Sequence, residues 1–186
     1  MGNQSSTRKP AKHRTGAAVV AEKLERAAKA GTLSLQQSKL KAVPPGVWSL
    51  ASLRALDLSH NSIVTLPLLL GVFGQLKSLR ITNNALAELP PLAELPKLQT
   101  LVLDHNSLAA LPPLPPSLKT LSAVANKLVG APMAVYACGK LTDIDLSQNP
   151  TMGAWQLPRP LDAPLLGALR RLGLDGCGLS SLPHDM

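Results

Sequence analysis

The sequence predicts an α/β fold: a right-handed solenoid of about seven repeats, each with one short parallel strand, behind an N-terminal capping helix. Two observations carry this prediction. One leucine pattern recurs through most of the 186-residue chain, and a segment with helical spacing of apolar residues precedes its first copy. With 45% of its residues apolar, a chain of this length can bury a continuous core.

Four segments align without gaps as LxxLxLxxNxLxxLP, and "LRALDLSHNSIVTLP" at 53–67 is the first of them. Further copies are visible at 33–44, 141–151 and 169–183. The residues at the asparagine position lie 23, 23, 22, 20, 23 and 28 residues apart along the chain. They are Ser38, Asn61, Asn84, Asn106, Asn126, Asn149 and Cys177.

The residue types of the repeat have physical reasons. Alternating leucines form a strand whose apolar face is buried only when neighbouring repeats stack on it. An asparagine amide can donate to and accept from backbone groups that are otherwise buried unpaired. We therefore expect Asn61, Asn84, Asn106, Asn126 and Asn149 to be structural, with Ser38 and Cys177 as weaker substitutes at the ends. The following Leu-Pro step favours short turns on the outer, convex side.

These motifs resemble the leucine-rich repeat family, and the resemblance covers residues 31–183. The family implies a non-catalytic module that binds another protein on its concave face. The start "MGN", a short helix and a "GxxxL" entry from Gly31 to Leu35 resemble small leucine-rich repeat proteins that begin with Met-Gly-Asn. That resemblance implies a membrane-tethered protein without enzymatic activity.

The predicted organisation has three parts: a flexible basic tail at 1–16, a capping helix at 17–31 and repeats at 32–186. Thr15 is the candidate N-cap of the helix, and Gly31 follows its end. One helix face carries Val20, Leu24 and either Ala27 or Ala28.

The far end of the repeats departs from the family pattern. The last repeat runs into "SSLPHDM" without a closing cap, so we expect either a fragment of a longer protein or a partner chain at this end. The long spacing before the last repeat predicts an outward loop at 150–168.

The opening "MGNQSS" matches an N-myristoylation motif, with Gly2 as the acceptor. One acyl chain anchors a protein weakly, and basic residues near an anionic leaflet supply a second signal. Those residues are Arg8, Lys9, Lys12 and Arg14. The prediction is a protein in the cytoplasm, peripheral on the cytoplasmic face of a membrane; the alternative is an ordinary solvated tail.

Composition argues against several other functions. Phe73, Tyr136, Trp48 and Trp155 are the only aromatic residues, too few for a base-stacking surface, so we expect no nucleic-acid partner. The two cysteines lie 39 residues apart without a CxxC motif, which predicts neither zinc site nor disulfide. We expect no catalytic residue, metal, cofactor or small-molecule substrate.

The residues between the leucines are predicted to face the concave side. One column contains Asp57 and Arg80, predicted to pair across strands, as are Asp143 and Arg171. A second contains His60, Asn83 and His105. The predicted partner-binding residues are Asp57, His60, Arg80, Asn83, Asp104 and His105. Two alternatives remain: a regulatory subunit for a phosphatase or small GTPase, and the repeat portion of an effector with a ubiquitin ligase domain, which the 20-residue spacing favours.

Overall fold

The computed structural model describes residues 16–130, 132–153 and 168–179. The predicted tail with its N-cap Thr15, most of the predicted loop at 150–168 and the end of the last repeat lie outside these residues. Within them, no helix combines the length and apolar character needed to cross a membrane.

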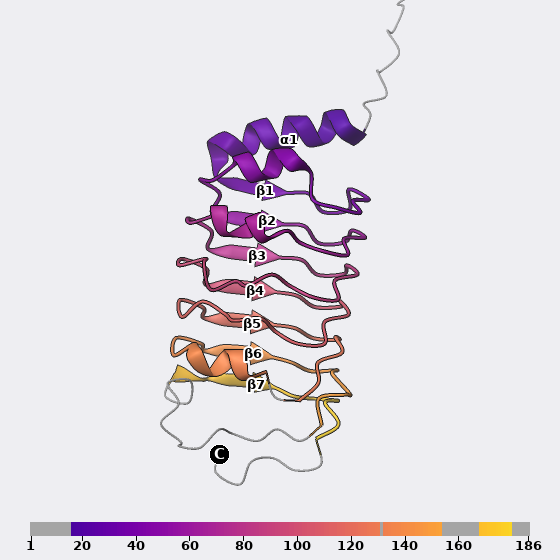
Figure 1. Cartoon of the computed structure of the whole chain (residues 1–186), viewed down its shortest axis with the longest axis vertical. Coiled ribbons are helices and arrows are strands. Elements are labelled where there is room, and N and C mark those ends of the chain that lie inside the picture. The colour runs from indigo at the N-terminus through magenta and orange to yellow at the C-terminus, as the bar shows by residue number, and fades with distance from the viewer. Residues whose placement is uncertain (1–15, 131, 154–167, 180–186) are drawn as a thin grey trace, which may run out of the picture.

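Seven short strands form one parallel sheet, in which each strand pairs with the next along the chain (Figure 1). The strands are β1 (Thr32–Ser34), β2 (Ala55–Asp57), β3 (Ser78–Arg80), β4 (Thr100–Val102), β5 (Thr120–Ser122), β6 (Asp143–Asp145) and β7 (Arg171–Gly173). Leu56 of β2 is in register with Leu33 of β1 and with Leu79 of β3. This confirms the predicted α/β solenoid and its repeat alignment.

The leucines of the repeat form one continuous core. Leu56, Leu58 and Leu79 are at most 1% exposed, like their equivalents in the neighbouring repeats. Burying one such side chain contributes about 1.5–3 kcal/mol. Because a single repeat cannot bury its apolar face alone, this stabilisation requires neighbouring repeats to stack on each other.

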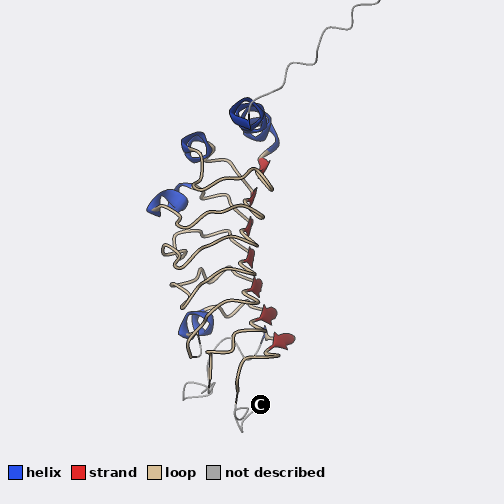
Figure 2. Ribbon diagram, turned by 90° about the vertical axis from the view of Figure 1, so that its right-hand side faces the viewer, coloured by secondary structure: helices blue, strands red, loops and turns tan. Residues whose placement is uncertain are grey.

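In the described residues, the side opposite the strands consists of loops and three short 3-10 helices, and it lies across from the strands in Figure 2. These are η1 (Pro45–Ser49), η2 (Leu68–Val72) and η3 (Met133–Ala137), and a proline directly precedes each of them. The fixed φ angle of proline suits a helix start, and its missing N–H is unneeded there. The proline-rich stretches at 90–96 and 112–116 have no helix on this side, because each proline removes a donor that a helical turn needs.

Helix α1 (Gly16–Ala30) lies at the amino-terminal end of the solenoid beside β1 (Figure 1). Ala27 is buried, Val20 and Leu24 pack against the core, and Ala28 is exposed, so Ala27 occupies the predicted apolar face. The helix ends at Gly31, whose φ of +69° suits glycine and whose N–H donates to Ala27 O at 2.8 Å.

Candidate functional site

The asparagines of the repeat connect each repeat with the one before it. The Oδ1 atom of Asn106 accepts from the N–H of Leu86 at 3.1 Å, and its Nδ2 donates to the carbonyls of Ile81, Leu103 and Asp104 at 2.8, 2.9 and 3.3 Å. Asn61, Asn84 and Asn126 make the same set of bonds in their own repeats. The amides thus satisfy backbone groups at every turn out of a strand.

Burial of the asparagine column increases along the chain. Asn106, Asn126 and Asn149 are 8%, 5% and 0% exposed, whereas Asn61 and Asn84 are half-buried. At the far end Cys177 takes the position, and its thiol lies 3.1 Å from Leu146 O. Burial raises the pKa of this thiol, which keeps it protonated and able to donate to that carbonyl.

The exposed side of the sheet, here called the strand face, carries the outward side chains of the first and third residue of each strand. The third residues form the predicted column: Ser34, Asp57, Arg80, Val102, Ser122, Asp145 and Gly173. Short polar side chains dominate both columns. The result is an open, ordered surface on a rigid backbone.

The predicted ion pair between Asp57 and Arg80 is wrong, because these two described residues form no salt bridge. The Asp57 carboxylate instead accepts the N–H of Ser59 at 2.9 Å and a hydrogen bond from the Gln36 amide. A hydrogen bond to a backbone group two residues away costs little side-chain entropy. An exposed ion pair costs more, because it fixes a long arginine side chain in one geometry. Arg80 is therefore left exposed on the strand face.

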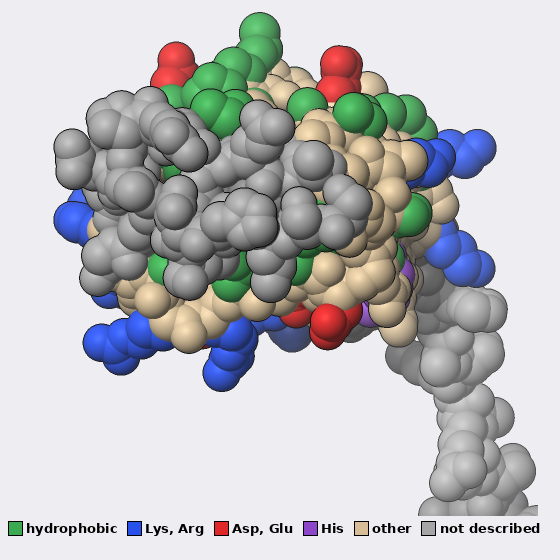
Figure 3. Space-filling model, turned by 90° about the horizontal axis from the view of Figure 1, so that it is seen from below, with side chains coloured by type: hydrophobic (Ala, Val, Ile, Leu, Met, Phe, Trp, Pro, Cys, Tyr) green, Lys and Arg blue, Asp and Glu red, His purple; other side chains and the backbone are tan. Residues whose placement is uncertain are grey.

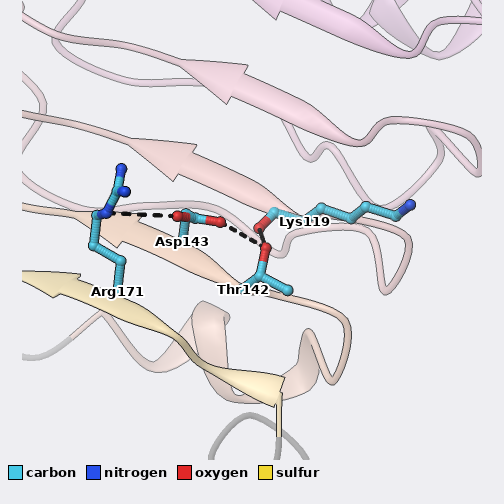
Figure 4. A network of polar contacts seen from close by, with 4 residues as sticks. All are labelled: Lys119, Thr142, Asp143 and Arg171. Atoms are coloured by element: carbon cyan, nitrogen blue, oxygen red, sulfur yellow. Dashed lines mark hydrogen bonds and ion pairs between the residues drawn. The ribbon is translucent and has the colours of Figure 1, made fainter.

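The second predicted pair is present. Arg171 Nε lies 3.8 Å from Asp143 Oδ1, and Thr142 Oγ1 donates to Asp143 Oδ2 at 2.7 Å (Figure 4). The Arg171 side chain is 79% exposed, so the pair contributes little stability. The Lys119 side chain extends away from this group of contacts (Figure 4).

The structure corrects the placement of His60, Asn83 and His105. Each lies in the turn after its strand, with φ between +54° and +57°, at the carboxyl-terminal rim of the sheet rather than within the strand columns. Their side chains are exposed. The alignment of these residues between repeats is correct. Each strand, however, ends at the residue between the two inner leucines of its repeat, and the chain adopts a left-handed conformation shortly afterwards.

Asp104 also has a local role in the turn. Its Oδ1 atom accepts the Ser122 hydroxyl at 2.5 Å and the Val124 N–H at 2.9 Å, both from the following repeat. The carboxylates of Asp57 and Asp145 instead accept N–H groups of their own repeat, from the residue two positions ahead. The acidic side chains of this region are thus partly satisfied by the protein itself.

Sequence reasoning missed a row of long basic residues at the opposite rim. The residue after the first leucine of each repeat is Arg54, Lys77, Gln99, Lys119, Thr142 and Arg170 in turn. We call this the amino-edge row. Each member after Arg54 donates its N–H to the carbonyl of the preceding member at 2.8–2.9 Å. These residues share one position of the aligned repeats, but exposed basic side chains leave no apolar periodicity in the sequence.

No group of three or more His, Cys, Asp or Glu side chains is placed to hold a metal ion in the described part of the chain. Cys138 is fully buried, and burial raises its pKa to about 11. Such a thiol is almost entirely protonated at neutral pH and is a poor nucleophile.

Comparison with family models finds "Leucine Rich repeats (2 copies)" at residues 75–116 and "Leucine Rich Repeat" at 52–73. A search of curated protein sequences found no match. Among solved structures, a Shigella effector leucine-rich repeat domain is similar with a TM-score of 0.63 and 24% identity, covering 92% of this chain and 81% of that one.

Two further solved structures have the same architecture. YopM, a leucine-rich effector protein from Yersinia pestis, has a TM-score of 0.67 and 25% identity, with 89% of this chain and 55% of YopM covered. An internalin from Listeria monocytogenes has a TM-score of 0.64 and 23% identity, with 81% and 43% covered. Together with the seven-stranded parallel sheet and the matched repeats, these likenesses identify the fold of this chain as a leucine-rich repeat solenoid.

Proposed function

We propose that this protein is a non-catalytic interaction module that binds another protein through its strand face. In the same proposal, the tail tethers it to the cytoplasmic side of an anionic membrane. The observation that carries the first part is the strand face itself, an open sheet surface of short side chains on seven hydrogen-bonded strands. Proteins with leucine-rich repeats generally bind other proteins, and extended solenoid faces are the surfaces that they offer.

The strand face suits a protein partner better than a small molecule. Its backbone is ordered by continuous strand pairing, so a partner need not pay to order loops. Val102 lies near the middle of the face, in the fourth of seven strands, and is half-exposed. Arg80 is exposed on the neighbouring strand. Aliphatic contact beside an unpaired arginine is typical of the centre of a protein interface.

A matched pair of substitutions tests this surface. Val102→Arg places a long cation in the strand face, whereas Val64→Arg makes the same change at a residue outside the strands that is 52% exposed. In proximity labelling from the intact chain, Val102→Arg should lose the labelled proteins that the wild type and Val64→Arg share. Circular dichroism checks that both variants fold. If only Val64→Arg lost the labelled proteins, the binding surface would lie outside the strands.

The tether rests on the sequence of the tail. Gly2 would carry the acyl group, and Arg8, Lys9, Lys12 and Arg14 would attract anionic lipid at about 1 kcal/mol each. Neither signal is sufficient alone. The resemblance to small leucine-rich repeat proteins that begin with Met-Gly-Asn supports the same assignment.

Vesicle flotation with the myristoylated chain tests the tether. Gly2→Ala, or neutral residues at the four basic positions, should each move most of the protein from anionic vesicles to the unbound fraction. High salt should have the same effect, because screening shortens the Debye length to about 3 Å at 1 M. A chain that gains no mass with an N-myristoyltransferase, or that stays bound after Gly2→Ala, would contradict the tether and leave the strand-face proposal intact.

A further inference from the structure

We propose that the amino-edge row binds an extended acidic segment of a partner protein. This proposal rests on the interaction function proposed above and adds a recognition element at one rim of the strand face. The row consists of Arg54, Lys77, Gln99, Lys119, Thr142 and Arg170, one residue from each repeat after the first.

The backbone holds this row straight. The N–H of Lys77 donates to Arg54 O at 2.8 Å, that of Lys119 to Gln99 O at 2.9 Å, and that of Arg170 to Thr142 O at 2.8 Å. Successive members are therefore separated by the spacing of hydrogen-bonded strands, about 4.8 Å. From first to last, the row is about 24 Å long.

The four basic members are available to a ligand. Arg54, Lys77, Lys119 and Arg170 are exposed, and within the described residues none of them forms an ion pair. The nearby carboxylate of Asp143 is already engaged by Arg171 and Thr142 (Figure 4). Viewed along the long axis, Lys and Arg side chains project well beyond the body of the molecule (Figure 3).

The other rim has a different charge pattern. Asp57, Asp104 and Asp145 lie toward the carboxyl ends of the strands, and each carboxylate accepts backbone N–H groups. The amino-edge row thus contains basic but no acidic residues, whereas carboxylates and the exposed Arg80 are mixed toward the other rim. A broad anionic surface such as a bilayer would meet these carboxylates together with the row, whereas a single peptide chain can follow the row alone.

The dimensions suit such a chain. An extended peptide rises about 3.3 Å per residue, so about seven residues span the row. Carboxylates of the peptide would pair with the four cations, and the side-chain amide of Gln99 between them would donate to a peptide carbonyl. Exposed ion pairs are individually weak and are screened by salt. The row should therefore supply affinity that depends strongly on salt and on the number of acidic residues.

The test measures binding of a fluorescent seven-glutamate peptide to the full chain by polarisation. The row variant combines Lys77→Glu and Lys119→Glu; its control combines Lys41→Glu and Lys127→Glu, which changes two exposed lysines that follow the strands by the same charge. We expect the row variant to bind at least tenfold more weakly than the wild type and the control to change less than twofold. A seven-glutamine peptide should not bind.

Equal losses in the two variants would overturn the proposal, since they would indicate attraction to net charge alone. Binding of the unmyristoylated protein to phosphatidylserine vesicles tests a membrane contact. If the row variant keeps peptide binding but loses this vesicle binding, the peptide proposal is wrong and the row contacts a membrane. The Val102→Arg variant separates the two proposals. Because this variant leaves the row intact and adds a cation, it should bind the peptide at least as tightly as the wild type. Failure of the strand-face assay therefore does not affect the peptide result, and failure of the peptide assay does not affect the strand-face result.

Discussion

Replacing Asn126 by alanine tests how the repeats are joined. The Asn126 amide accepts the N–H of Leu108 at 3.1 Å and donates to Leu103 O, Ala123 O and Val124 O at 3.1–3.2 Å. All three carbonyls keep other donors, because Asn106 Nδ2 reaches Leu103 O, Asn149 Nδ2 reaches Ala123 O and the His105 N–H reaches Val124 O. Only the Leu108 N–H loses the partner described for it.

Each buried group left without a partner costs about 1–3 kcal/mol. The Asn126→Ala substitution should therefore lower the free energy of unfolding by about 1–3 kcal/mol, which corresponds to a fall in Tm of roughly 5 °C for a chain of this size. Urea unfolding followed by circular dichroism measures the loss. Hydrogen exchange at the Leu108 amide reports on the orphaned donor directly.

Asn83→Ala is the matched control. Asn83 is exposed, and its described hydrogen bonds use its backbone N–H and carbonyl. Ala125 occupies the equivalent left-handed turn with φ +53°, so the backbone tolerates alanine there. The control should lose no more than about 1 kcal/mol. A loss below about 0.5 kcal/mol for Asn126→Ala, or equal losses for both variants, would refute the role assigned to the amide.

Two further predictions concern the helix end and the buried thiol. Gly31→Ala should destabilise the protein by about 1–2 kcal/mol in thermal unfolding, because φ is +69° and the new Cβ would lie 3.1 Å from Arg54 Nε; an unchanged Tm would argue against this helix end. For Cys138, burial raises the pKa from 9.0 to about 11, so the unfolded chain releases its proton first as the pH rises. Stability should thus be unaffected by this group below pH 9 and fall by up to about 2–3 kcal/mol between pH 9 and 11, and urea midpoints should show a smaller fall for Cys138→Ala.

The repeat geometry could be predicted from sequence because it depends on short-range periodicity. Alternating leucines such as Leu56 and Leu58 specify a strand with one buried face, and the fixed offset to Asn61 specifies where the chain leaves it. The spacing also aligned Asp57 with Arg80, as the strand register confirms. Helix α1 followed from its apolar spacing and from Gly31.

The site could be predicted only in part, because side-chain partners depend on local competition. Asp57 and Arg80 lie opposite each other on adjacent strands. The Asp57 carboxylate nevertheless accepts a hydrogen bond from the Ser59 N–H and forms no ion pair with Arg80. Sequence periodicity does not report the positive φ of His60, because this conformation is uncommon in residues other than glycine. The amino-edge row was missed because its side chains, such as Lys77, serve no purpose in the fold and so leave no periodic apolar signal.

The left-handed turns at the carboxyl rim imply that substitutions at these turns can still raise the stability of the solenoid. Asn83 and Gly176 are residue types that adopt this backbone readily. The same conformation is imposed on Gln37, His60, His105, Ala125 and Gln148. Natural selection removes variants below a stability threshold and does not optimise those above it. Asparagine or glycine at these five turns should therefore raise the stability of the array without changing its core or its strands, although His60 and His105 are also predicted partner-binding residues.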